Sequence, residues 1–242
     1  MDRKSADTAH RSNSLLNALS GSDFAKLKPH LSIVDLEHRA ILADVGDRIR
    51  YAYFPHSAVI CLMAVMQDTR VAETATIGLE GMVGFEILLH RPNASNRSLV
   101  QVPGAASRIS SRQLADAMHE STSLQSLLFK YVGALFIHTT QSVACNSLHK
   151  LEERCCRWLL MAHDRAGRDR FDLTQDFLAE MLGVHRPTVT IVARALQAAG
   201  LINYSRGVVT ILDRTGLEQS ACECYGVVKQ AYAELGSRGS GA

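Results

Sequence analysis

The sequence is short of the features that mark specialised protein classes. Its 242 residues include only five prolines and one tryptophan, and 26 basic against 24 acidic residues leave a net charge of +2. No apolar run approaches the roughly 20 residues that a membrane-spanning helix needs. The polar start MDRKSADTAHRSNS lacks the apolar stretch of a secretory signal. We expect a cytoplasmic protein without a membrane partner, whose overall charge says little about its ligands.

The cysteines do not indicate a secreted disulfide scaffold. Six cysteines without a secretory signal fit a reducing compartment better than a disulfide framework. Cys61, Cys145 and Cys155 are most simply buried apolar residues. Cys222 and Cys224 form a C-E-C pair typical of a redox or metal motif, but two ligands do not close a zinc site. We expect no metal ion and no cofactor.

Catalytic motifs are missing. The sequence has no phosphate-binding loop, no nucleophile elbow and no helical pair of metal-binding histidines. Glu152 and Glu153 are better interpreted as a solvated helix start than as an acid/base pair. We expect a protein that is not an enzyme.

What is present falls into distinct regions, of the α+β class. In residues 31–109, apolar runs such as AVICLMAVM, VAETATIGL and RSLVQVP alternate with Gly, Pro, Asn and Asp. This pattern predicts short strands joined by tight turns. We predict a β-roll sensor domain over residues 1–120, entered by a polar arm and the short helix SLLNALSGSDFAKL.

Residues 121–148 are predicted to form one long helix with two apolar sides. One seam recurs every three or four residues, and Phe129, Val132, Phe136 and Val143 make a second face. One side can pack on its own domain, and a two-fold partner helix is the simplest cover for the other; burial of both inside one globule is the alternative. We assign the dimer contact to the seam, where His138 would fix the register: Leu124, Leu128, Tyr131, Leu135 and His138.

The most informative stretch is LTQDFLAEMLGVHRPTVTIVARALQAAGLINYSRGVVTIL, residues 173–212. Thr174 can cap a helix over residues 175–182 that stops at Gly183. A second helix over residues 186–199 carries Pro187 in its first turn, where no hydrogen bond is lost. Two β-rich runs around Arg206 then predict a hairpin. Together they predict a winged helix-turn-helix within residues 149–217, followed by a C-terminal tail over residues 218–242.

This stretch is locally basic. There is no Asp or Glu between Met181 and Leu212, whereas Arg186, Arg194 and Arg206 contribute three positive charges. Such a surface suits phosphates and base edges in the major groove of double-stranded DNA. A winged helix that contacts protein is the alternative. We predict these DNA contacts: Thr174, Gln175, His185, Arg186, Thr188, Thr190, Arg194, Ser205 and Arg206.

Here the sequence resembles the Crp/Fnr superfamily of bacterial transcription regulators. The resemblance lies in the "T-x-x-x-(I/L)-A-x-x-(L/V)-G" first helix, the "R-x-T-V" start of the second, the "L-x-x-x-G-L-I" exit and the "G-x-(I/V)-x-(I/L)" wing. It implies a cytoplasmic homodimer that reads a palindromic operator and works with RNA polymerase. By the same resemblance Arg186 reads a guanine, whereas Pro187 stands where well-known members often carry a cytosine-binding Glu.

The resemblance also reaches GLEGMVGFEILL, which is similar to the glycine-rich effector turn of that family. Its candidate effector residues are Gly84, Phe85, Glu86, Arg97 and Ser98, of which the last two resemble the Arg-Ser pair that cyclic-nucleotide binders place on the cyclic phosphate. Phe85 stands where cyclic-nucleotide binders carry a ribose-binding Glu, with Glu86 one place late. We therefore expect an effector other than cyclic AMP, of unknown identity. Two alternatives remain: a cyclic-nucleotide-binding effector protein whose winged helix contacts protein, and a constitutive DNA binder whose roll is a relic.

Overall fold

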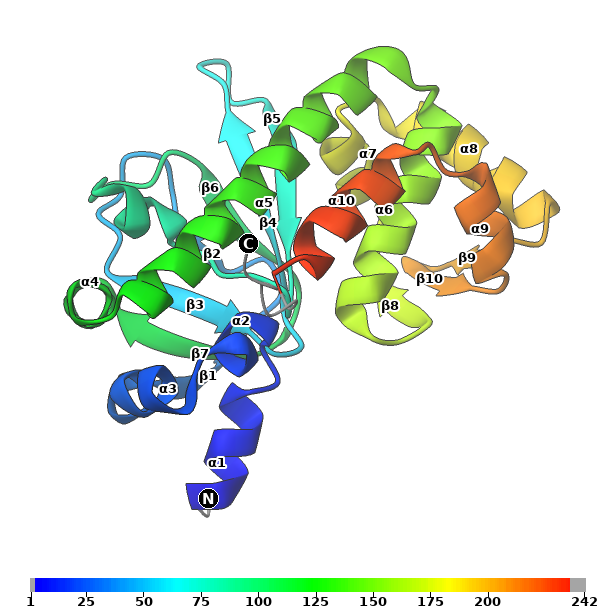
Figure 1. The fold of residues 1–242 in the computed structure, drawn as a ribbon. Coiled ribbons are helices and arrows are strands. Elements are labelled where there is room, and N and C mark those ends of the chain that lie inside the picture. Colours follow the sequence, from blue (N-terminus) through cyan, green and yellow to red (C-terminus); the bar gives the residue numbers. More distant parts are fainter. Residues whose placement is uncertain (1–2, 236–242) are drawn as a thin grey trace.

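The structure, a computed structural model, describes residues 3–235 (Figure 1). A β-rich N-terminal half and a mostly helical C-terminal half are joined by one long helix, α5, which runs diagonally across the molecule. None of the helices in this described part is long and apolar enough to cross a membrane. Residues 236–242 of the predicted tail lie outside it.

Short helices precede the sheets: α1 (Arg3–His10), α2 (Ser14–Ala18), α3 (Gly21–Leu27) and the 3-10 helix η1 (Lys28–His30). The predicted polar arm is therefore largely helical, and the single predicted helix is two. The chain breaks because the Ser20 side chain accepts the backbone N–H of Asp23 and starts a new helix. Asn13 caps α2 and donates its side-chain amide to the carbonyls of Pro55 and Gly81, which fixes this segment on the roll.

The predicted β-roll is confirmed. Its antiparallel strands form two sheets, in the orders β1-β7-β3 and β2-β6-β4-β5, around a core that includes Phe54, Ile60, Val100 and Ile109. The 3-10 helix η2 (Phe85–Leu89) lies between β5 and β6. The strands are β1 (Ser32–Leu36), β2 (Ile41–Ala43), β3 (Tyr51–Pro55), β4 (Val59–Val65), β5 (Val71–Ile77), β6 (Arg97–Val102) and β7 (Gly104–Ser110).

Helix α4 (Ser111–Glu120) leads into α5 (Thr122–Leu148), so the long helix is where the sequence predicts it. The assignment of its two faces is wrong, however. The seam expected to meet a partner is at most 3% exposed in its own protomer, because it packs on the roll and on the C-terminal helix. The buried seam residues are Leu124, Leu128, Tyr131, Leu135 and His138. The apolar side left open carries Phe129, Phe136, Ile137 and Val143, with Phe136 68% exposed.

The C-terminal half is the predicted winged helix. Helix α6 (Leu151–Ala166) ends at Gly167 in the left-handed conformation, and a three-stranded sheet of order β8-β10-β9 closes the domain. Val189, Ala193 and Leu196 bury one side of the second helix-turn-helix helix in the domain core. The elements are β8 (Arg170–Asp172), α7 (Gln175–Leu182), α8 (Arg186–Ala198), β9 (Ile202–Ser205) and β10 (Val208–Ile211).

The predicted tail is folded as far as the structure describes it. Helix α9 (Arg214–Ser220) packs on α6, and α10 (Cys224–Ala233) turns back to lie beside α5 and α6 (Figure 1). Tyr232 of α10 donates to or accepts from Nδ1 of His138, 3.1 Å away. Burial of α10 explains why the inner side of α5 is apolar beyond the roll: part of it is covered by the chain's own C-terminus.

The two halves touch through buried polar contacts as well as apolar ones. The indole N–H of Trp158 on α6 donates to the carboxylate of Glu73 on β5, at 3.1 Å. Nearby, Arg165 pairs with Glu80 at 2.7 Å. Trp158 therefore packs between the winged domain and the roll, so that α6 couples the two.

Candidate nucleic-acid interface and effector cavity

The helix-turn-helix is built by local signals. The Thr174 hydroxyl accepts the backbone N–H of Phe177, and Gly183 closes α7 with φ +66°, a conformation that glycine adopts without strain. Pro187 lies in the first turn of α8, where its missing N–H costs nothing. The residues at the start of α8, from His185 to Thr188, are exposed, whereas Val189 behind them is buried in the domain.

Most of the predicted DNA contacts are exposed on one continuous surface. Gln175 accepts the Thr190 hydroxyl at 2.7 Å, which ties the two helices together. The carbonyl of Gly207 accepts the N–H of Leu173, so the wing tip adjoins the start of α7. We call the whole set the recognition surface; Gln175 and Thr190 are half-buried in it and the rest are exposed: Thr174, Gln175, His185, Arg186, Thr188, Thr190, Arg194, Ser205 and Arg206.

The wing turns tightly at its tip. Arg206 and Gly207 both have positive φ, 51° and 75°, the pattern of a two-residue hairpin turn with the twist that β-strands require. Tyr204 fixes the hairpin by donating its hydroxyl to the carbonyl of Leu173. The arginine at the tip is therefore held out into solvent beside the start of α7.

One acidic side chain intrudes on this basic surface. Asp176, in the first turn of α7, lies 3.3 Å from the guanidinium of Arg186, and the two side chains are 67% and 62% exposed. The stretch between Met181 and Leu212 contains no acidic residue, but the folded surface that it forms has Asp176 beside it. A pair this exposed contributes little and is easily exchanged for another anion.

The comparisons with known proteins agree with this geometry. Residues 153–220 match the family model of the Crp-like helix-turn-helix domain. The C-terminal domain is therefore a Crp-like helix-turn-helix domain. With this domain, the protein is a DNA-binding transcription regulator.

Solved structures of Crp/Fnr regulators share the fold of this chain over nearly their whole length. FixK2 from Bradyrhizobium japonicum is 14% identical, with 79% of this chain and 98% of that one covered, at a TM-score of 0.68. The c-di-GMP-responsive regulator CLP from Xanthomonas campestris is 17% identical, with 80% and 100% covered, at 0.64. A CRP-family regulator from Thermus thermophilus is 18% identical, with 78% and 96% covered, at 0.63. No curated protein matches the sequence significantly.

The roll of this regulator contains a cavity of about 400 Å³. Three of the predicted effector residues line it: Gly84, Glu86 and Ser98. Gly84 has φ +87°, and a Cβ there would lie 2.9 Å from the carbonyl oxygen of Tyr51, so only glycine fits. Buried Glu86 accepts the N–H and the hydroxyl of Ser95.

The other two predicted effector residues do not line this cavity. Phe85 lies in a separate hollow beside α5, against Val132. The inference that it displaces a carboxylate from the cavity is therefore wrong, because Glu86 takes that place. Arg97 donates to both carboxylate oxygens of Asp44, at 3.1 and 2.8 Å, and this pair lowers the pKa of Asp44.

Sequence reasoning missed the cavity's other polar wall. It comes from β3 and the irregular segment just before it. Only the alternation of Tyr51 and Tyr53 within the strand is a signal that the sequence could have revealed. The polar residues of this wall are Asp47, Arg48, Arg50, Tyr51 and Tyr53.

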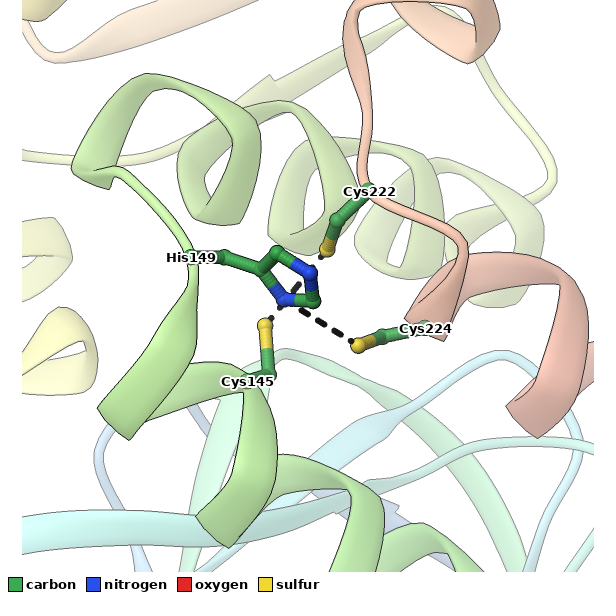
Figure 2. A group of neighbouring side chains, drawn as sticks. All are labelled: Cys145, His149, Cys222 and Cys224. Carbon is green, nitrogen blue, oxygen red and sulfur yellow. Dashed lines mark hydrogen bonds between the residues drawn. The ribbon is translucent and has the colours of Figure 1, made fainter.

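It also missed a cluster at the far end of α5. Cys145, His149, Cys222 and Cys224 place four potential ligand atoms within 4.8 Å of one another (Figure 2). Cys222 and Cys224 form the C-E-C pair seen in the sequence, but Cys145 lies 77 residues before Cys222, on the other side of the winged domain in sequence. No spacing motif therefore linked the pair to Cys145 and His149. We refer to these four residues as the C-terminal cluster.

Proposed function

We propose that the regulator binds DNA as a homodimer, with α8 of each protomer in successive major grooves of a palindromic operator. The observation that carries this proposal is the recognition surface, where the exposed start of α8 and the wing tip flank the capped start of α7. Arg186 is the residue we assign to a guanine, by two hydrogen bonds to O6 and N7. Thr174 and Arg206 are assigned to phosphates.

The dimer is proposed to form through the open face of α5. A face containing Phe129, Phe136, Ile137 and Val143 along one helix is costly to leave in water. Two-fold pairing of such helices would set the two recognition helices about 34 Å apart, one turn of DNA. Phe136→Lys is expected to shift the protein from dimer to monomer in sedimentation velocity, without loss of helical circular dichroism.

The roll cavity is proposed to hold a small polar effector other than cyclic AMP. Arg97, which corresponds to the phosphate-binding arginine of the nucleotide binders, is engaged by Asp44 and does not line the cavity. Binding would act on DNA affinity only if the effector prefers one arrangement of the dimer. In the cell, we place the protein in the cytoplasm, with RNA polymerase as a partner and without catalytic activity of its own.

The proposal is tested by selecting bound sequences from a random double-stranded DNA pool at two salt concentrations. A palindrome with half-sites about one helical turn apart, retained at the higher salt, is the expected result. Arg186→Ala should erase the selected base at one position of each half-site. Arg112→Ala removes the same charge from an exposed site on α4 and should leave the palindrome intact. If neither variant changes the selected sequences, α8 is not the recognition helix, and the alternative of a protein-contacting winged helix gains support.

A further inference from the structure

We propose that Cys145, His149, Cys222 and Cys224 bind one Zn²⁺ ion in a closed, four-coordinate structural site. The site is separate from the recognition surface and from the roll cavity. Three thiolates and one imidazole are a ligand set that zinc favours in structural sites, and no position is left for substrate or water. The expected absence of a metal is thereby replaced by a specific metal site.

The spacing of the ligand atoms fits one ion. Sγ of Cys145 and Sγ of Cys222 are 3.5 Å apart, and Nδ1 of His149 is 3.4 Å from Sγ of Cys224. Around a tetrahedral zinc ion with bonds of about 2.3 Å to sulfur and 2.0–2.1 Å to nitrogen, ligand atoms are separated by about 3.6–3.8 Å. The four side chains in Figure 2 converge on one point from two segments of the chain, so only small adjustments would admit the ion. An iron–sulfur cluster would hold them farther apart, because its own atoms occupy the space between them.

The groups around the ligands are those that zinc sites use. Nε2 of His149 lies 3.2 Å from a carboxylate oxygen of Glu223, which orients the ring and leaves Nδ1 for the metal. The side-chain amide of Gln141 donates to Sγ of Cys224 at 3.1 Å. A hydrogen bond of this kind stabilises a thiolate. All three cysteines are buried, so the site excludes competing water.

Two arginines beside the cluster would also be stabilised by a negative charge there. Zn²⁺ displaces one proton from each of the three thiols, so that the bound site carries a net charge of −1. Buried Arg157 and half-buried Arg154 each leave Nε without a hydrogen-bond partner. Both guanidinium groups lie close enough to Cys145 to interact with it electrostatically. A negatively charged metal site would give both arginines a counter-charge.

The position of the site indicates what the metal would hold together. Cys145 lies in the last turn of α5, and His149 is the cap residue between α5 and α6. Cys222 and Cys224 flank the start of α10. One ion would therefore pin the C-terminal helix to the joint that connects the long helix with the DNA-binding domain.

The main competitor is a disulfide between Cys145 and Cys222. Such a bond needs a sulfur–sulfur distance of about 2.05 Å, and it would leave the orientation of His149 and the position of Cys224 unexplained. The two states differ chemically: zinc binding releases protons without electron transfer, whereas the disulfide requires an oxidant.

The test begins with the full-length, untagged protein purified without chelator. Elemental analysis should find one zinc ion per chain, and a mercurial that blocks thiols should release it to a colorimetric zinc indicator. Exchange with Co²⁺ should give sulfur-to-cobalt charge transfer in the near ultraviolet and the intense visible bands of tetrahedral Co²⁺. These measurements on the wild-type protein do not depend on how any variant folds.

The variants identify the ligands. Cys222→Ala and Cys145→Ala should each lose most or all of the bound zinc. Cys155→Ala, the same truncation at a buried cysteine outside the cluster, is the control and should keep it. The proposal is overturned if the wild-type protein takes up no zinc, if its cobalt spectrum lacks sulfur charge transfer, or if peptide mapping finds a Cys145–Cys222 disulfide. Equal zinc loss in all three variants would also overturn it, since binding would then follow general folding.

Discussion

The recognition surface and the C-terminal cluster sit at opposite extremes of burial. On the recognition surface, most side chains are exposed and the one ion pair, Arg186 with Asp176, is loose and solvated. In the cluster, the thiols are buried and already directed at one another and at His149. A ligand can bind to the recognition surface by replacing water and weakly held side-chain partners. A ligand of the C-terminal cluster must become part of the folded interior.

The difference teaches where stability and where recognition reside. Exposed pairs are worth little to folding and can be traded for phosphates. Buried polar groups are costly unless they are fully satisfied. We therefore expect changes in the cluster to alter mainly the stability of the fold, and changes on the recognition surface to alter mainly DNA affinity.

The largest expected effect is on the buried side. If the proposed zinc is present at about a thousand times its dissociation constant, removing it should lower the free energy of unfolding by about 4 kcal/mol, or about 8–16 °C in Tm. Calorimetry before and after chelation, with zinc added back as control, measures this. A Tm unchanged by chelation of a fully metal-loaded sample would contradict a structural role.

The next effect is on the exposed side. Arg186→Ala should cost about 1–3 kcal/mol of binding at each half-site and relax the preference for its base. Fluorescence anisotropy with the selected operator and with a scrambled duplex measures both. The Tm of this variant should stay within about 1–2 °C of the wild type, since exposed substitutions usually cost under 0.5 kcal/mol. A large fall in Tm would contradict the view that the recognition surface affects DNA affinity more than stability.

A third effect depends on pH. Burial, with the charges of Arg165 and Arg157, holds the pKa of His138 well below its usual value, so the folded state keeps the ring neutral beside Tyr232. The unfolded chain takes up a proton below about pH 6.5, so stability is complete above that pH and falls as the pH decreases. At pH 5 the loss is about 2 kcal/mol at most.

His138→Gln isolates this contribution, because glutamine does not titrate and can still reach the tyrosine. Urea unfolding at pH 7.5 and pH 5 should show a smaller difference in the variant than in the wild type. His10 and His56 also have lowered pKa values, owing chiefly to burial, and remain in both proteins as an internal background. An equal pH dependence in both would show that His138 does not drive the loss.

How much the sequence predicts follows the same division. The winged helix is formed by one continuous stretch of sequence, whose helices are bounded by Thr174, Gly183, Pro187 and Gly200. Such short-range signals can be recognised without a structure. The order of roll, long helix and winged helix is also confirmed. The C-terminal cluster forms only because α10 folds back against α5, and no local sequence pattern predicts that contact.

The faces of α5 show a subtler limit. Periodicity reveals two apolar sides but not which one the chain itself covers, because that depends on α10 and the roll. The more regular seam turned out to be the inner one, containing Tyr131, whose hydroxyl donates to the carbonyl of Met82. Similarly, counting from Gly84 places Phe85 in the cavity, whereas the turn of η2 directs Glu86 there. A shift of one residue in a tight turn reverses such an inference.

The smallest expected effect tests whether Asp176 weakens DNA binding or positions Arg186 for it. Asp176→Asn removes the carboxylate beside Arg186 without changing its size, and it removes a negative charge from a surface that meets phosphates. DNA should bind about 1.4- to fivefold more tightly, since an exposed pair contributes about 0.2–1 kcal/mol. The gain should shrink as salt is raised, because both terms are screened. Asp172→Asn, which removes an exposed charge in β8 that is not paired with Arg186, is the control. An equal gain in both variants would assign the effect to general repulsion; weaker binding by Asp176→Asn would mean that this carboxylate positions Arg186 for its base.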